Sequence, residues 1–159
     1  MRAYLRLASL YFVLLAVCAA GRWLLGVAGT PYVRGHHIFS IVILTLMSCL
    51  FYGAFCRRFL GHRAAQAMLL GMILGLSSQI VIAALTLLSY GLGVDTYFNH
   101  STALSVTRLG EAEGWTVPLG EALRRRAAGL VFNPVACGIT ATLGWALGAL
   151  LPAAERRPD

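Results

Sequence analysis

The chain has 159 residues, of which 58% are hydrophobic and 12% are charged. A soluble domain usually has about a quarter of its residues charged, so this composition excludes an ordinary soluble protein and predicts a single transmembrane domain over residues 1–159. The 13 basic residues are all arginines, and against 6 acidic residues they give a net charge of +7. This charge favours anionic lipid headgroups. The arginines do not gather in one soluble segment, so nucleic acid is not an expected partner.

The first apolar stretch covers approximately residues 7–28. As a helix, its roughly 22 residues would be about 33 Å long, enough to cross a hydrocarbon core of about 30 Å. The beginning of the chain also resembles a signal peptide, because arginines precede the apolar run and small residues stand near position 20. The apolar run resumes after Arg22, however, so we predict an uncleaved helix that spans the membrane.

Three further spans are predicted at approximately residues 36–56, 64–92 and 134–151. The third is long, about 43 Å as a helix, so we expect it to tilt or to protrude from the bilayer. At the start of the fourth span, Asn133 can cap free N–H groups while Pro134 takes the first helical position, where no donor is needed. The sequence therefore predicts an all-α membrane protein, a four-helix bundle.

Spans three and four are joined by a connection of about 40 residues, 93–132, the only sizeable segment expected outside the membrane. Within it, the segment VPLGEALRRRAAGLV has a proline at a plausible helix start, Glu121 in the first turn and arginines later, an order that suits the helix dipole. We leave two interpretations open, a short helix lying along the outer membrane surface and a solvated loop.

The orientation follows from the arginines that flank the spans. The segment CRRFLGHR between spans two and three is the densest basic flank, so we expect it to stay in the cytoplasm. Both termini then lie in the cytoplasm, and residues 93–132 lie outside. The predicted location is the bacterial cytoplasmic (inner) membrane, crossed several times.

Small residues recur on one face of each of the last two spans. Gly71 and Gly75 form a G-x-x-x-G pattern in the third span, and Gly144 and Gly148 form another in the fourth. Between helices in lipid there is little hydrophobic drive, so such residues allow the close backbone approach that packing requires. The pattern predicts helix packing and no particular activity.

The most polar point of any span is SSQ in the third span, with a threonine two turns later. The candidate intramembrane polar site comprises Ser77, Ser78, Gln79 and Thr86. The amide of Gln79 needs partners that hydrocarbon does not offer, so it predicts either a hydrogen bond to a neighbouring helix or a ligand pocket. Arg22 is the only charge within a span, and we expect its side chain to reach the headgroups.

Histidines and oxygen ligands gather at the predicted outer surface. The candidate cluster comprises His36, His37, Asp95, Asn99 and His100. Histidine and carboxylate bind zinc, copper or iron, so a metal or haem site is one interpretation. A surface that binds a partner or a quinone headgroup, and plain interfacial histidines, are the others. No cofactor is predicted, and the metal remains unknown.

The sequence contains no pattern that points to catalysis. The four cysteines have no C-x-x-C pair, and there is no G-x-S-x-G, H-E-x-x-H, P-loop or dinucleotide fingerprint. We therefore expect a non-catalytic membrane subunit, assembly factor or anchor whose partners are the lipid bilayer and other membrane subunits or further copies of itself. The alternatives are a small permease or channel lined by the polar residues of span three, and a redox protein that uses the histidine cluster.

Overall fold

The computed structural model describes residues 7–106 and 114–150. Within these residues the chain is helical and has no strand longer than an isolated bridge. The elements in chain order are α2 (Ser9–Val27), α3 (Tyr32–Gly35), α4 (Ile41–Arg58), α5 (Ala64–Gly91), the 3-10 helix η1 (Thr102–Leu104) and α6 (Leu119–Leu147). This confirms the all-α class over the described residues. By length and composition, the four longest helices are each long and apolar enough to cross a membrane.

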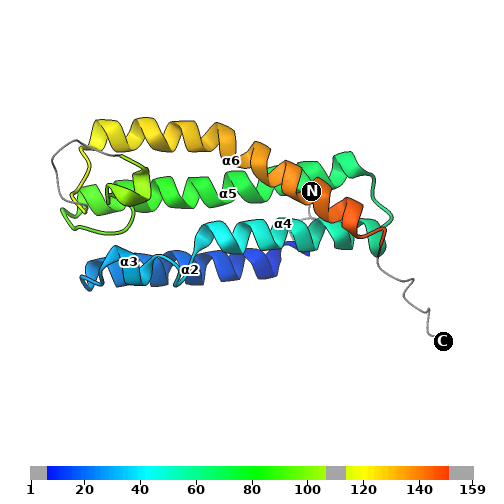
Figure 1. Cartoon of the computed structure of the whole chain (residues 1–159), viewed down its shortest axis with the longest axis horizontal. Coiled ribbons are helices and arrows are strands. Elements are labelled where there is room, and N and C mark those ends of the chain that lie inside the picture. Colours follow the sequence, from blue (N-terminus) through cyan, green and yellow to red (C-terminus); the bar gives the residue numbers. More distant parts are fainter. Residues whose placement is uncertain (1–6, 107–113, 151–159) are drawn as a thin grey trace.

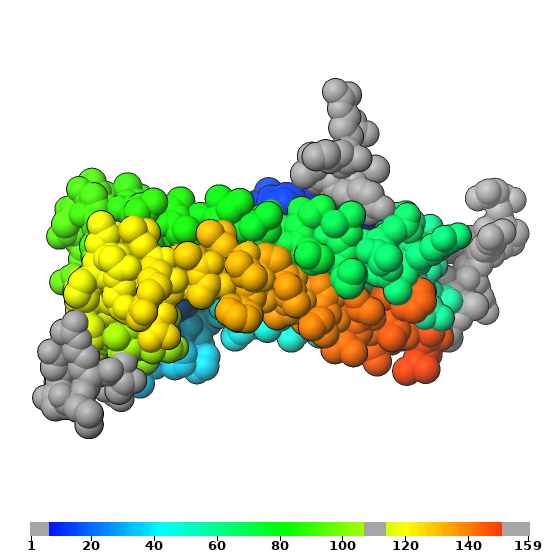
Figure 2. Space-filling model, turned by 90° about the horizontal axis from the view of Figure 1, so that it is seen from above, coloured from blue at the N-terminus to red at the C-terminus, as the bar shows by residue number. Residues whose placement is uncertain are grey.

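The four long helices lie side by side along the longest axis of the molecule (Figure 1). Helices α4, α5 and α6 pack against one another, and α2 packs on the outer side of α4 and α5. Figure 2 shows α6 running along one face beside α5. The connection between α5 and α6 closes one end of the assembly, and the turn between α4 and α5 closes the other (Figure 1).

The second span begins later than the sequence indicates, because the chain first forms the short helix α3 and then a turn. His36 ends α3, and Phe39 adopts a left-handed backbone with φ of 53°. The side chain of Ser40 then accepts a hydrogen bond from the N–H of Ile43 at 3.4 Å and caps α4. His36 and His37 therefore stand before the helix and not within it.

The predicted helix start at Asn133 and Pro134 is wrong. Helix α6 begins after Pro118 and continues through Pro134, so the segment interpreted as a surface helix or a loop is the first half of α6. A proline inside a helix removes one hydrogen bond and bends the helix, and Figure 1 shows α6 changing direction near its middle. The segment that joins α5 to α6 is consequently residues 92–118.

The glycines of both small-residue patterns face neighbouring helices at close range. A Cβ atom at Gly71 would lie 2.5 Å from the carbonyl oxygen of Cys137 in α6, and one at Gly75 would lie 2.8 Å from the Cβ of Cys137. A Cβ at Gly144 would lie 2.2 Å from the carbonyl oxygen of Leu50 in α4, and one at Gly148 would lie 2.9 Å from that of Ala54. These approaches place α6 directly against α5 and α4.

A buried tyrosine connects α2 to this group. Tyr11 is 1% exposed, and its hydroxyl lies 3.1 Å from Oγ1 of Thr45 in α4. The same hydroxyl donates to the carbonyl oxygen of Leu74 in α5 at 3.0 Å. One side chain thus holds three helices together through hydrogen bonds that hydrocarbon cannot replace.

Candidate functional site

The connection between α5 and α6 folds into an ordered layer, which we call the cap (residues 92–106 and 114–118 of the described chain). Asn99 is 2% exposed; its side-chain oxygen accepts from the N–H of Thr96 at 2.7 Å, and its amide nitrogen donates to the carbonyl of Val94 at 3.0 Å. The N–H of Val117 donates to the carbonyl of Asn99 at 2.9 Å. The side chain of Asn99 therefore stabilises the backbone of the cap through hydrogen bonds. The sequence alone does not distinguish this role from ligand binding.

The cap is bound to several helices. The Tyr97 hydroxyl donates to the carbonyl of Thr30, between α2 and α3, at 2.8 Å. Burial raises the pKa of Tyr97 above its ordinary value, and Arg22 opposes this shift, so the phenol stays protonated and acts as the donor. Thr96 hydrogen-bonds to Ser89 of α5 at 2.8 Å, and Tyr90 of α5 donates to the carbonyl of Val117.

The three histidines of the outer-face cluster gather around one tyrosine. The ring of Tyr32 stacks on His100 with centroids 4.8 Å apart and on His36 with centroids 5.5 Å apart, and His37 lies against His36 at 3.6 Å. The structure thus brings together histidines that the sequence separates by more than sixty positions. Stacked rings of this kind form a continuous aromatic surface.

The oxygen ligands of the same cluster are used differently. Asp95 Oδ1 accepts a hydrogen bond from the Thr116 hydroxyl at 2.5 Å, and Asn99 serves the backbone. Over residues 7–106 and 114–150 there is no group of three or more His, Cys, Asp or Glu side chains placed to hold a metal ion. What the structure brings together in the described cluster is the set of stacked rings of Tyr32, His36 and His100.

The candidate intramembrane polar residues point to different places. The hydroxyls of Ser77 and Ser78 donate to carbonyls of their own helix, at Ile73 and Gly75, with distances of 2.7 and 2.8 Å. Thr86 does the same to Ile82 at 2.8 Å. Such hydroxyl-to-carbonyl bonds within one helix need no partner on another helix. Gln79, in contrast, faces α6: it is 5% exposed, and its amide oxygen lies 2.8 Å from where a Cβ would stand on Gly129.

Arg22 turns into the protein at the cap end of α2. Its Nη1 donates to the carbonyl of His36 at 2.8 Å, and its guanidinium carbon lies 5.4 Å from the ring centroid of Tyr97 and 5.9 Å from that of Tyr32. These contacts combine a charge-assisted hydrogen bond with two cation–π interactions. The side chain is therefore held in place by the cap and by residues 32–40, which we call the α3 turn.

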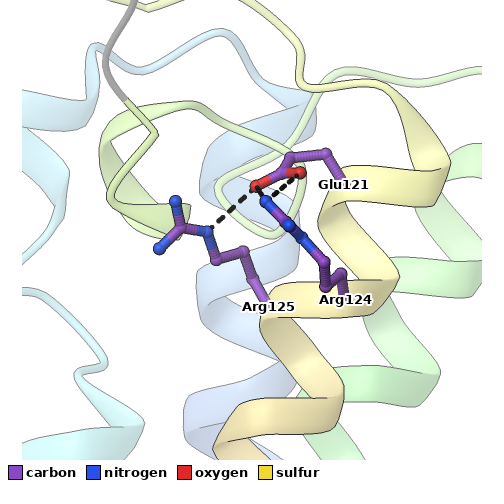
Figure 3. A network of polar contacts seen from close by, with 3 residues as sticks. All are labelled: Glu121, Arg124 and Arg125. Carbon is purple, nitrogen blue, oxygen red and sulfur yellow. Dashed lines mark hydrogen bonds and ion pairs between the residues drawn. The ribbon is translucent and has the colours of Figure 1, made fainter.

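A second inward arginine, Arg126, comes from α6, and the sequence analysis missed it. Its Nε donates to Oγ1 of Thr86 at 3.0 Å, and its Nη2 donates to the carbonyl of Phe98 at 2.8 Å. Its two neighbours, Arg124 and Arg125, pair with Glu121 on the exposed side of the helix (Figure 3). Three consecutive helical residues point in directions about 100° apart, so one of the three arginines faces the other helices.

Arg22 and Arg126 line the same cavity at the cap end of the helices. The cavity measures about 130 Å³ and is also lined by Tyr32, Ser40 and Tyr97. We call it the two-arginine cavity. Asp95 and Glu121 are the acidic residues within the described part of the chain, and both have other hydrogen-bond partners. No described carboxylate forms an ion pair with either arginine of the cavity.

A second cavity of about 130 Å³ lies deeper, between α4, α5 and α6. It shares Ile41, Val42 and Ile82 with the two-arginine cavity, and Ser78 and Gln79 supply part of its wall. The rest of the lining consists of Thr45, Leu46, Asn133, Ala136 and Cys137. Most of the surface that faces the cavity is apolar, so we call it the apolar cavity. The two cavities are therefore neighbours with a common wall.

Similarity to known proteins does not identify the chain. No protein-family model matches it, and no curated protein or solved structure is detectably similar to it. The function must therefore be inferred from the arrangement of its own residues.

Proposed function

We propose that this chain is a non-catalytic membrane subunit or anchor, in which four helices form a bundle and the cap recognises another membrane protein. In this proposal the bundle crosses a bacterial cytoplasmic membrane, both termini lie in the cytoplasm and the cap lies outside. The observation that supports it is the order of the described part of the cap. A hydrogen bond between Thr96 and Ser89, and one from Tyr90 to the carbonyl of Val117, attach it to α5, and Tyr97 donates to Thr30 between α2 and α3.

A rigid cap suits recognition because binding segments are commonly loops held in position by a scaffold. Beside it, the α3 turn exposes apolar side chains: Val33 is 73% exposed, Ile38 is 49% exposed and Phe39 is 40% exposed. The stacked rings of Tyr32, His36 and His100 continue this surface. The glycines of both patterns already contact neighbouring helices within the chain, so we propose that the partner binds at the α3 turn and the adjoining cap.

Co-purification from native membrane tests the proposal. We expect the tagged chain, extracted in mild detergent, to retain a stoichiometric membrane partner, and Val33→Gln to lose that partner because it removes the most exposed apolar group of the α3 turn. Phe59→Gln is the matched control, since Phe59 is 62% exposed at the opposite end of the assembly.

Two results would overturn the proposal. The first is a chain that elutes alone from native membrane at every detergent tested. The second is an equal loss of the partner in both variants, which would contradict recognition at the α3 turn and the cap.

A further inference from the structure

We infer that the two-arginine cavity binds the anionic headgroup of an amphiphile, and that the adjoining apolar cavity takes the beginning of its hydrocarbon chain. The ligand class is a phosphate-bearing lipid. This inference concerns a small-molecule site and does not depend on the protein partner proposed above.

The first argument is the charge of the cavity. Arg22 and Arg126 are near enough for their positive charges to repel each other, and both side chains are only partly exposed. Like charges held together away from water raise the free energy of the site unless an anion stands between them. Because the described carboxylates are engaged elsewhere, the chain does not itself supply that anion within its described residues.

The second argument is the supply of hydrogen-bond donors. A guanidinium has five N–H groups. The hydrogen bonds to the carbonyls of His36 and Phe98 and to the Thr86 hydroxyl use one N–H of Arg22 and two of Arg126, so donors remain on both groups. Ser40 accepts from Ile43, which leaves its own hydroxyl proton for a ligand. Phosphate offers several acceptor oxygens and pairs well with such donors.

The third argument is depth. Arg22 stands five residues before the end of α2, and Arg126 stands seven residues after the start of α6. At 1.5 Å per residue these positions are about 8 and 10 Å from the helix ends, where headgroups give way to acyl chains. The two helices run in opposite directions, so both arginines arrive at the same level.

The fourth argument is the wall that the two cavities share. Ile41, Val42 and Ile82 line both of them, so a headgroup between the arginines has apolar surface directly beneath it. A free inorganic anion would make no use of that surface, whereas an acyl chain would bury it from water. The pairing of the cavities therefore favours a ligand with a hydrocarbon tail.

Binding of phosphatidic acid tests the inference. The full chain is placed in nanodiscs of phosphatidylcholine, and phosphatidic acid is added while bound lipid is counted by native mass spectrometry and thermal unfolding is followed. We expect saturable binding and a higher Tm. We expect Arg22→Gln and Arg126→Gln each to weaken binding about tenfold, since each removes a charge-assisted contact.

Arg124→Gln is the matched control. It removes the same charge from the same helix two positions away, but Arg124 pairs with Glu121 and its side chain is 75% exposed. We expect it to leave the affinity unchanged. Equal weakening by Arg124→Gln and Arg126→Gln would mean general attraction by surface charge and would overturn the site. Thermal unfolding without added lipid shows whether each variant folds. If Arg126→Gln does not fold, Arg126→Lys, which keeps the charge, is measured in its place.

Two further measurements separate the headgroup from the tail. Ala136→Leu narrows the apolar cavity. We expect it to weaken the binding of long-chain phosphatidic acid and to leave the binding of short-chain phosphatidic acid unchanged. Inorganic phosphate is expected to compete weakly. If inorganic phosphate raises the Tm as much as phosphatidic acid does, the ligand is a soluble anion, and the inference of an amphiphilic ligand is overturned. The absence of saturable binding by either probe overturns the anion site itself.

Discussion

At the scale of single residues, several polar side chains of α2 form hydrogen bonds with other segments of the chain. Tyr11 connects α2 to Thr45 and to the carbonyl of Leu74, and Trp23 donates from the same helix to Ser89 at 3.2 Å. Arg22 adds its bond to the carbonyl of His36. Helix α2 has fewer contacts with its neighbours than the other long helices have with one another, so these polar contacts contribute to its position together with the buried Leu15 and Ala19.

Removing the Tyr11 hydroxyl should therefore loosen α2. We expect Tyr11→Phe to lower the free energy of unfolding by about 1 kcal/mol, the usual net effect of losing a buried hydrogen bond. Thr140→Val is a suitable control, because that hydroxyl is bonded only to Ala136 in its own helix. Unfolding in detergent measures the free energy of unfolding of both variants. An equal decrease in the two would contradict the role assigned to Tyr11.

Gln79 is the buried polar group whose role the sequence left undecided. We expect Gln79→Leu to lower Tm, because the amide faces α6 at Gly129 and contributes to the contact between α5 and α6. Ser77→Ala serves as the control, since the Ser77 hydroxyl returns to its own helix. An unchanged Tm together with altered ligand binding or solute flux would instead mean that Gln79 acts on a ligand in the apolar cavity, whose wall it helps to form.

At the scale of helices, the closest contacts are those between α6 and its two neighbours. We expect Gly144→Ala to lower the free energy of unfolding by about 1–3 kcal/mol, because the new Cβ would meet the backbone oxygen of Leu50 at 2.2 Å and a helix would have to move. A Cβ at Gly120 meets nothing within 4 Å. Gly120→Ala in the same helix should stabilise by up to about 1 kcal/mol. The reverse order of the two melting temperatures would refute this packing.

How far the sequence predicts these helices depends on the kind of signal. Apolar runs locate all four long helices, because length and hydropathy determine what can cross a bilayer. The local pattern at Asn133 and Pro134 misleads, since a proline is tolerated inside a membrane helix whose neighbours satisfy the freed groups. Arg126 escapes notice because RRR in a presumed surface segment does not reveal which arginine turns inward. That direction depends on Glu121 and on the position of α5.

At the scale of the whole molecule, the side-by-side helices place the α3 turn and the α4–α5 turn at opposite ends (Figure 1). We expect Arg34→Cys to react with a membrane-impermeant thiol reagent only from outside the cell, and Phe59→Cys only from the cytoplasmic side. Both residues are exposed. The experiment uses a background in which the native cysteines are replaced, and labelling of both positions from one side would refute the proposed topology.

The central place of α6 affects how the molecule can be made. Translation produces α2, α4 and α5 before α6, and most of the contacts that fix α4 and α5 are with α6. Until then Gly53 and Gly71, which α6 later covers, face lipid or a chaperone. The nascent protein therefore stays loosely assembled until α6 has been made, and this interval is when we expect quality-control proteases to degrade it most readily.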